Sequence, residues 1–280
     1  MVRQRGSRAA GQNIGLGDKP GEKNSQERGR EDPSRESPPR GRAAPLTRFI
    51  DLSHSIENGM TTYPGLPAPI ICDYLSREAS RARYAPGVEF QIGKIEMIAN
   101  TGTYIDAPFH RYKDGLDLAQ LPLESLADLD TAVVRSPVGA NREMTRAMFE
   151  GVDLGGKAVL VQTGWDVHWR TEHYLSGHPF LTGDAAEYLV AEGAVLVGID
   201  SLNIDDTSDL SRPVHSTMLA AGVPIVEHMC NLSRVPDRHF RFFAVPAKVT
   251  GFSSWPVRAF GYALPPNDRL RFSRRRSPLG

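Results

Sequence analysis

The segment NTGTYIDAPFH, residues 100–110, carries side chains that can bind a metal or exchange a proton. Asp106 offers a carboxylate, Asn100 an amide oxygen and Tyr104 a phenol. His110 offers an imidazole, whose ordinary pKa of about 6.5 allows proton exchange near neutral pH. We therefore expect His110 to act as a general acid or base.

A second segment, RPVHSTMLAAGVPIVEHMCNL, supplies two more side chains of metal-binding type. His215 is expected at the start of a helix, and Glu227 lies 12 positions later in the next expected strand. A fold that joins them to Asp106 would suit a divalent cation, which makes hydroxide available near pH 7, as a hydrolase requires. A lone histidine at a helix start and a lone glutamate in a strand also occur without a ligand. Spacing alone leaves both interpretations open.

The elements that must position these residues form a mixed α/β pattern. Short apolar runs predict strands at residues 49–52, 89–98, 131–134, 158–162, 194–199, 225–230, 240–245 and 258–263. Helical patterns with acidic first turns or glycine ends predict helices at 142–150, 166–170, 182–192 and 214–221. One domain over residues 46–270 accounts for all of them.

The two ends of the chain differ from this domain in composition. Residues 1–45 are rich in Arg, Gly, Ser, Glu and Pro and have almost no aromatic or β-branched residues, which predicts a disordered tail. Residues 271–280 belong to the arginine-rich end RLRFSRRRSPLG and predict a basic C-terminal tail. The excess of arginine in both tails leaves contact with nucleic acid as an alternative to simple solvation.

Charge balance and cysteine content limit the partners and the location. Lys plus Arg and Asp plus Glu both number 33, so no net charge draws the chain to nucleic acid or a membrane surface. We therefore expect a small-molecule partner. The two cysteines are too few for a disulfide framework, and no apolar run approaches the roughly 20 residues of a membrane helix. The sequence predicts a soluble cytoplasmic protein.

Several segments together resemble the cyclase family of metal-dependent hydrolases, which includes bacterial kynurenine formamidase, isatin hydrolase and polyketide cyclases. They are DLSHSIENGMTTYPG, NTGTYIDAPFH, RYKDG, GIDSLNIDD, RPVHSTMLAAGVPIVEHMCNL and FFAVPAKVTGFSSWPVRAFG, in the family's order. The resemblance covers nearly all of residues 46–263. It implies an α/β fold of the swivelling β/β/α type, with a mixed β-sheet forming a barrel-like core, flanking helices and commonly a dimer.

The family signature, His-x-Gly-Thr-His-x-Asp-x-Pro-x-His, is changed at two positions in this chain. Asn100 and Tyr104 replace its first two histidines, whereas its Gly-Thr, Asp, Pro and final His are kept. In the family these two histidines help to hold one of a pair of metals. The resemblance therefore implies that the metal site of this chain is altered.

The remaining ligands implied by the resemblance are Asp106, His215 and Glu227, joined by the amide oxygen of Asn100. Because oxygen replaces nitrogen, zinc loses preference, whereas harder ions such as manganese lose less. We expect one divalent ion per chain, manganese or zinc. A site without metal remains an alternative, since an amide is a weak ligand and the phenol of Tyr104 binds strongly only after losing its proton.

Aromatic residues near the expected site indicate the substrate. Tyr63, Phe109 and Trp165 would suit a flat aromatic amide. The resemblance implies hydrolysis of an amide or lactam C–N bond, like the arylformamidase step of tryptophan catabolism, with His110 and Tyr104 as catalytic residues. Tyr104 would donate a hydrogen bond to the oxyanion. Two alternatives are a polyketide-type cyclase or dehydratase and an aromatic-ligand-binding protein that has lost catalysis.

Overall fold

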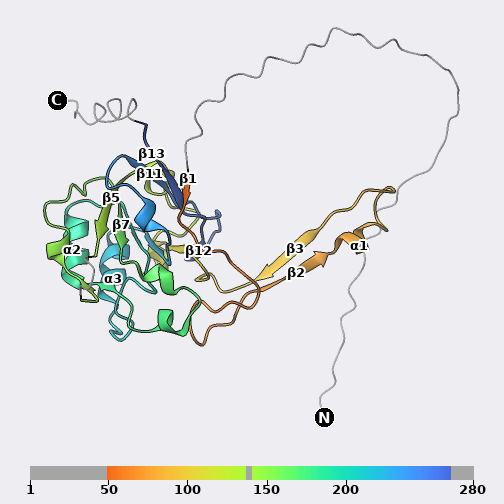
Figure 1. Cartoon of the computed structure of the whole chain (residues 1–280), viewed down its shortest axis with the longest axis horizontal. Coiled ribbons are helices and arrows are strands. Elements are labelled where there is room, and N and C mark those ends of the chain that lie inside the picture. Colours follow the sequence, from red (N-terminus) through yellow and green to blue (C-terminus); the bar gives the residue numbers. More distant parts are fainter. Residues whose placement is uncertain (1–48, 137–140, 266–280) are drawn as a thin grey trace, which may run out of the picture. The chain divides into compact units, whose positions relative to one another are not determined.

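The computed structural model describes residues 49–136 and 141–265 (Figure 1). The predicted tails, 1–45 and 271–280, and the predicted domain limits at 46 and 270 lie outside these residues. The helices are α1 (Arg77–Ser80), α2 (Gly183–Ala191) and α3 (Pro213–Ala220). The strands are β1 (Phe49–Asp51), β2 (Ile70–Leu75), β3 (Ile92–Glu96), β4 (Tyr104–Asp106), β5 (Leu129–Arg135), β6 (Glu143–Met144), β7 (Ala158–Gln162), β8 (Phe180–Leu181), β9 (Leu196–Ile199), β10 (Ile225–Glu227), β11 (Phe240–Phe243), β12 (Ser254–Pro256) and β13 (Phe260–Ala263).

A curled nine-stranded sheet in the order β1-β13-β11-β5-β7-β9-β10-β4-β12 forms the body of the domain. Its central strands β5, β7, β9 and β10 are parallel, and the outer strands pair antiparallel. Strands buried on both faces consist of continuous apolar runs, and β7 and β9 have this composition. The predicted α/β fold with a barrel-like sheet is confirmed.

Alternating side chains of the central strands pack into two separate cores. Val159 and Val161 of β7 pack with residues of α2 and α3, which therefore cover one face of the sheet. Leu160 points to the other face, where it packs with Phe240 and Phe242 of β11. Burial of each such side chain contributes about 1.5–3 kcal/mol, so the strands that carry the site are held firmly on both faces.

Strands β2 and β3 form a separate antiparallel hairpin whose side chains are largely exposed. Ile70, Tyr74 and Ile95 expose 53%, 75% and 56% of their surfaces. An isolated two-stranded hairpin is at best marginally stable in water, and its exposed apolar side chains lie on both faces, since Ile70 pairs with Glu96 and Ile71 with Ile95. In the described ranges, no helix is long and apolar enough to cross a membrane.

Most predicted strands are found, but the prediction differs from the structure in two ways. The helix expected at 142–150 is wrong: the segment forms β6, which pairs with β8, and a single turn at Arg146–Met148. The helix expected at 166–170 is a short 3-10 turn, Trp165–His168. Strands β2, β4, β6, β8 and β12 were not predicted. All of them except β2 have only two or three residues and are defined by pairing with distant segments.

Candidate active site

Strand β4 brings four functional side chains onto one face of the sheet. Tyr104 and Asp106 are two positions apart in β4 and therefore point to the same side. Glu227 of β10 lies directly opposite Tyr104, and Ser254 of β12 lies directly opposite Asp106. The pairing of three short strands thus assembles residues that lie as many as 150 positions apart in the chain.

Asp106, His110 and His215 form the group best placed to hold a metal. One ligand atom from each of them lies within 4.8 Å of the others. Asp106 is fully buried, and its Oδ2 has no hydrogen-bond partner among the described residues. His215 Nε2 lies 3.6 Å from this oxygen. An unpartnered buried carboxylate oxygen is costly, and a cation between these groups would satisfy it.

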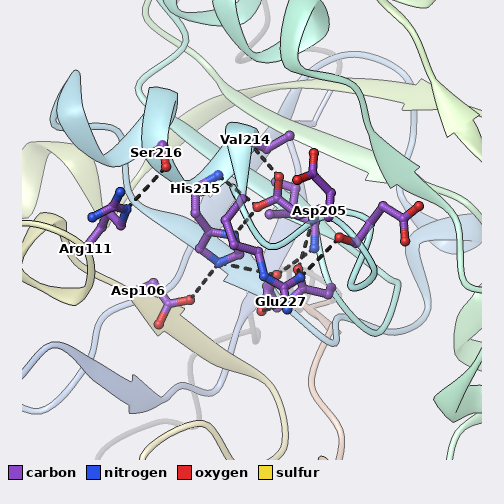
Figure 2. A network of polar contacts seen from close by, with 12 residues as sticks. Asp106, Arg111, Asp205, Val214, His215, Ser216 and Glu227 are labelled. Atoms are coloured by element: carbon purple, nitrogen blue, oxygen red, sulfur yellow. Dashed lines mark hydrogen bonds and ion pairs between the residues drawn. The ribbon is translucent and has the colours of Figure 1, made fainter.

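Asp205 fixes the orientation of His215 (Figure 2). Its carboxylate accepts the backbone N–H groups of Val214 at 2.7 Å and His215 at 3.1 Å, so it is an acceptor that holds the start of α3. It also contacts His215 Nδ1 at 2.6 Å. Nδ1 therefore carries the proton, and the lone pair of Nε2 faces the site, as in metal-binding histidines supported by a carboxylate.

The electrostatics of this group favour a positive charge at its centre. Burial lowers the pKa of His215, but the neighbouring carboxylates of Asp106, Asp205 and Glu227 outweigh burial and raise it to about 10. The imidazole would therefore hold a proton when no other cation is present. A divalent ion would take the place of that proton, so the donor set and its charge fit the metal implied by the resemblance.

Ser254 determines which nitrogen of His110 faces the cavity. Its hydroxyl donates a short hydrogen bond to Asp106 Oδ1, so its proton is already used. The 3.1 Å contact between Ser254 Oγ and His110 Nδ1 then requires a proton on Nδ1. His110 therefore offers an Nε2 lone pair, and the side chain is about one-third exposed, at 35%.

Glu227 is placed differently from Asp106, because both of its oxygens accept hydrogen bonds. Oε1 accepts the backbone N–H of Ile204 at 2.6 Å. Oε2 accepts a short bond from the Tyr104 phenol and a longer one from the Asn203 amide at 3.4 Å, and the Tyr63 hydroxyl oxygen lies 3.3 Å from it. Oε1 lies 3.7 Å from Nε2 of His215, so Glu227 adds negative charge beside the metal group.

The Tyr104 phenol is a neutral donor in this arrangement. Burial and the charge of Glu227 raise its pKa well above the ordinary value, which disfavours a phenolate ligand. Its oxygen also lies 2.9 Å from the Tyr63 hydroxyl, which in turn bonds the carbonyl of Leu202 at 2.7 Å. The phenol predicted to donate to an oxyanion is thus directed at Glu227.

Asn100 lies beside the metal group, with its amide nitrogen toward Asp106. Nδ2 donates to Asp106 Oδ1 at 3.3 Å. The backbone between Asn100 and β4 turns at Gly102, where φ is +67° and a Cβ would lie 2.9 Å from Ile56 Cγ1. Only glycine fits this turn without displacing Ile56, which explains why the segment keeps Gly at this position.

A cavity of about 280 Å³ opens onto this group, and its lining residues are Tyr63, Leu66, Asn100, Tyr104, His110, Arg111, Asn203, Arg212 and His215. Of the three aromatic residues predicted to bind substrate, this lining contains Tyr63 only. Phe109 is half-buried in the turn Pro108–His110. Trp165 donates from its indole to the carbonyl of Tyr174 at 3.1 Å and lies outside the lining.

Sequence reasoning missed four residues of the site: Asp205, Ser254, Arg111 and Arg212. A signal existed for Asp205, because GIDSLNIDD follows a parallel strand, and the carboxyl ends of such strands commonly carry functional side chains. Ser254 gave no signal, since its role depends on the pairing of β12 with β4.

Comparison with known proteins relates most of this chain to nearly the whole length of its relatives. The Cyclase family model matches residues 50–206. Kynurenine formamidase of Bacillus cereus is 29% identical over 223 residues, covering 76% of this chain and 96% of the relative. Kynurenine formamidase of Bacillus cytotoxicus is 29% identical over 217 residues, with the same two shares.

Solved structures resemble the domain over most of its length. A protein described as a potential metal-dependent hydrolase with cyclase activity has a TM-score of 0.64 and 26% identity, with 78% of this chain and 99% of the other covered. Isatin hydrolase A from Labrenzia aggregata, bound to benzyl benzoate, has a TM-score of 0.67 and 20% identity, with 77% and 93% covered. The second likeness concerns the fold.

Proposed function

The chain belongs to the Cyclase family, and on this premise we propose that it is a metal-dependent hydrolase of amide or lactam C–N bonds, with arylformamidase-like activity. The observation that carries the proposal is the unpartnered, fully buried Oδ2 of Asp106, which faces His215 Nε2 at 3.6 Å beside the cavity. The kynurenine formamidase relatives support an aryl formamide as the substrate class.

Asp106 and His215 would hold the ion, which we propose to be a single manganese or zinc per chain. A bound divalent ion supplies an activated water and a polarised carbonyl at neutral pH. Asp205 keeps the lone pair of His215 Nε2 directed into the site. Glu227 and Asn100, the other predicted ligands, lie beside the group with hydrogen bonds of their own.

His110 is the residue we propose to move the proton. Its Nδ1–H bonds Ser254, so Nε2 can accept a proton from the attacking water and return it to the departing amine. The same lone pair would otherwise complete the ligand set. The metal content of His110→Ala separates the two roles: a protein that keeps its metal but loses turnover supports proton transfer, whereas a protein that loses both supports ligation.

Tyr104 acts as a positioning residue in this proposal. Its phenol holds the buried Glu227 carboxylate by a short hydrogen bond. The Tyr63 ring lines the same cavity, where it would contact the aromatic part of a substrate. Both residues therefore act on the shape and charge of the cavity rather than on bond breakage.

We also propose that the protein is a cytoplasmic homodimer and that the β2–β3 hairpin contributes to the interface. The hairpin exposes Ile71 and Ile95, which lie directly opposite each other on one face that a second copy of the chain would cover. Light scattering after size exclusion should give about twice the chain mass of 30.8 kDa. An Ile95→Glu variant should shift to the monomer, and a dimer unaffected by this change would exclude the hairpin from the interface.

The enzymatic proposal is tested by measuring formate release from formyl-aryl amides, N-formylkynurenine among them. The protein is assayed after removal of metal by a chelator and again after reloading with manganese or zinc. Activity that disappears with the metal and returns on reloading is expected. Equal activity in the chelated protein would contradict a metal-dependent hydrolase, and binding of the amide without release of formate would favour a non-catalytic binding protein.

A further inference from the structure

The cavity beside the metal group is lined by two guanidinium groups and no carboxylate. Arg111 and Arg212 are both among the lining residues, and none of the other lining residues is Asp or Glu. Neither arginine forms an ion pair within 4.0 Å in the part of the chain that the structure describes. Arg212 is partly buried and Arg111 is exposed. Two guanidinium groups without a carboxylate partner that converge on one cavity point to an anionic ligand.

Arg212 occupies a backbone conformation that is unfavourable for it. Its φ and ψ are 50° and 60°, in the left-handed region, immediately before α3. Such strain persists where the surrounding structure requires it and is concentrated at functional sites. Nη1 makes both hydrogen bonds of the guanidinium, to Asn203 Oδ1 at 3.5 Å and Asp206 O at 3.3 Å. Among the described residues, no acceptor bonds Nε or Nη2, so one edge of the fork is available.

Arg111 reaches the same cavity from the turn that carries His110. Its Nε bonds the hydroxyl of Ser216 at 3.3 Å, which links this turn to α3 (Figure 2). Within the described ranges, its two terminal nitrogens have no hydrogen-bond acceptor. Arg111 directly follows His110, and Arg212 lies three positions before His215, so both guanidinium groups belong to segments that carry the metal group.

We propose that Arg111 and Arg212 bind a carboxylate of the substrate, so that the enzyme hydrolyses anionic aryl amides in preference to neutral ones. A guanidinium offers parallel N–H donors that match a carboxylate in two-point contact, and hydrogen bonds between charged groups are about twice as strong as neutral ones. The carboxylate would fix the aromatic ring while the amide carbonyl faces Asp106 and His215. The inference rests on the proposed hydrolase function and adds the charge of its substrate.

A pair of substrates of nearly equal shape tests the proposal. 2-Formamidobenzoate carries a carboxylate, and 2-formamidobenzamide carries a neutral amide at the same place. The metal-loaded, full-length enzyme should favour the benzoate in kcat/KM. Arg212→Gly removes the guanidinium and also relieves the left-handed backbone, so the fold should be retained. It should raise the KM for the benzoate about tenfold or more and leave the benzamide nearly unchanged.

Arg170→Gly is the matched control. Arg170 also has a positive φ, 65°, but pairs with Glu57 at 2.7 Å and lies outside the cavity lining. This variant should leave the kinetics of both substrates unchanged. Arg111→Met should repeat the selective effect of Arg212→Gly. A wild-type preference for the benzamide, or arginine variants that affect both substrates equally or neither, would overturn the proposal.

A binding measurement separates this proposal from the hydrolase proposal. Calorimetric titration of the full-length protein with 2-aminobenzoate and with 2-aminobenzamide needs no turnover. Selective loss of 2-aminobenzoate binding in Arg212→Gly supports the anion subsite even if neither amide is hydrolysed. If chelation of the metal abolishes 2-aminobenzoate binding and the arginine variants do not change it, the carboxylate binds the metal and the subsite is refuted.

Discussion

Two of the buried carboxylates beside His215, those of Asp106 and Glu227, are satisfied in opposite ways. Asp106 receives donors at Oδ1 only, and its Oδ2 is left facing His215 Nε2. Glu227 receives donors at both oxygens, chiefly the Ile204 amide and the Tyr104 phenol. Asp106 is therefore arranged to accept a cation, whereas Glu227 is satisfied by hydrogen bonds. We call Asp106 and His215 the metal half of the site, and Glu227 and Tyr104 the phenolic half. Where the resemblance implies two metals, this chain has one metal group and one phenolic group.

Restoring the two signature histidines at positions 100 and 104 is expected to have the largest effect on the difference between Asp106 and Glu227. Asn100→His together with Tyr104→His returns one imidazole beside Asp106 and one beside Glu227, and it removes the phenol that occupies the Glu227 carboxylate. The variant is expected to bind about two divalent ions per chain, compared with about one in the wild type, because imidazole is the better zinc ligand. Elemental analysis after dialysis against zinc measures this, and an unchanged ratio of one would show that the two positions do not control metal number.

Asp205→Asn should weaken the metal half alone. The amide keeps the shape but no longer orients His215 as a carboxylate does, so the metal affinity is expected to fall about 10–100-fold. Competition with a fluorescent chelator measures the change. Asp209, an exposed residue of the same loop, provides the control through Asp209→Asn. Equal metal affinity in the Asp205 variant and the wild type would refute the orienting role.

Tyr104→Phe should weaken the phenolic half alone. Glu227 loses its shortest side-chain donor while remaining fully buried, and a hydrogen bond to a charged group contributes about 1.5–3 kcal/mol to stability. The free energy of unfolding in urea should fall by about this amount, with metal affinity nearly unchanged. If the variant instead keeps its stability and loses its metal, the division of the site into two halves is incorrect.

His215 in the site and His54 outside the cavity lining should respond differently to acid. His215, among carboxylates, has a raised pKa, whereas burial lowers the pKa of His54 to about 4. His54 stacks on Trp169 with ring centroids 4.0 Å apart. Because the unfolded chain binds this proton more readily, the stability from neutral His54 is complete above about pH 6.5 and is lost as the pH falls toward 4.

The effect of His54 is expected to be the smallest, on the order of 1 kcal/mol, because the imidazole is partly exposed. Urea midpoints at pH 7 and pH 5 should differ less in His54→Gln than in the wild type. An identical pH dependence in both proteins would show that His54 is not titrated on unfolding in this range.

The sequence predicted the parts of the fold that have local signals. The continuous apolar runs of β7 and β9 and the helices α2 and α3 were found because their patterns extend over several residues. The helix expected at 142–150 failed because the residues around Met144 pair with β8, a segment 36 or more positions away. Local preference carries no information about such pairing.

Residue type and spacing left the metal site open, and the resemblance to the cyclase family supplied the candidate residues, Asp106, His110 and His215 among them. The structure brings one ligand atom from each of these three residues within 4.8 Å of the others. It could not be foreseen that Ser254 would determine the tautomer of His110, or that the Tyr104 phenol would serve Glu227. Both depend on the register of β4 with β10 and β12.

Metal content measured by elemental analysis tests the central claim most directly. The wild type and Asp106→Ala are analysed as isolated and after dialysis against manganese or zinc. The account predicts about one ion per wild-type chain and almost none in Asp106→Ala, which lacks the unpartnered carboxylate oxygen. A wild-type chain without metal under every condition, or a variant that binds metal as well as the wild type, would contradict it.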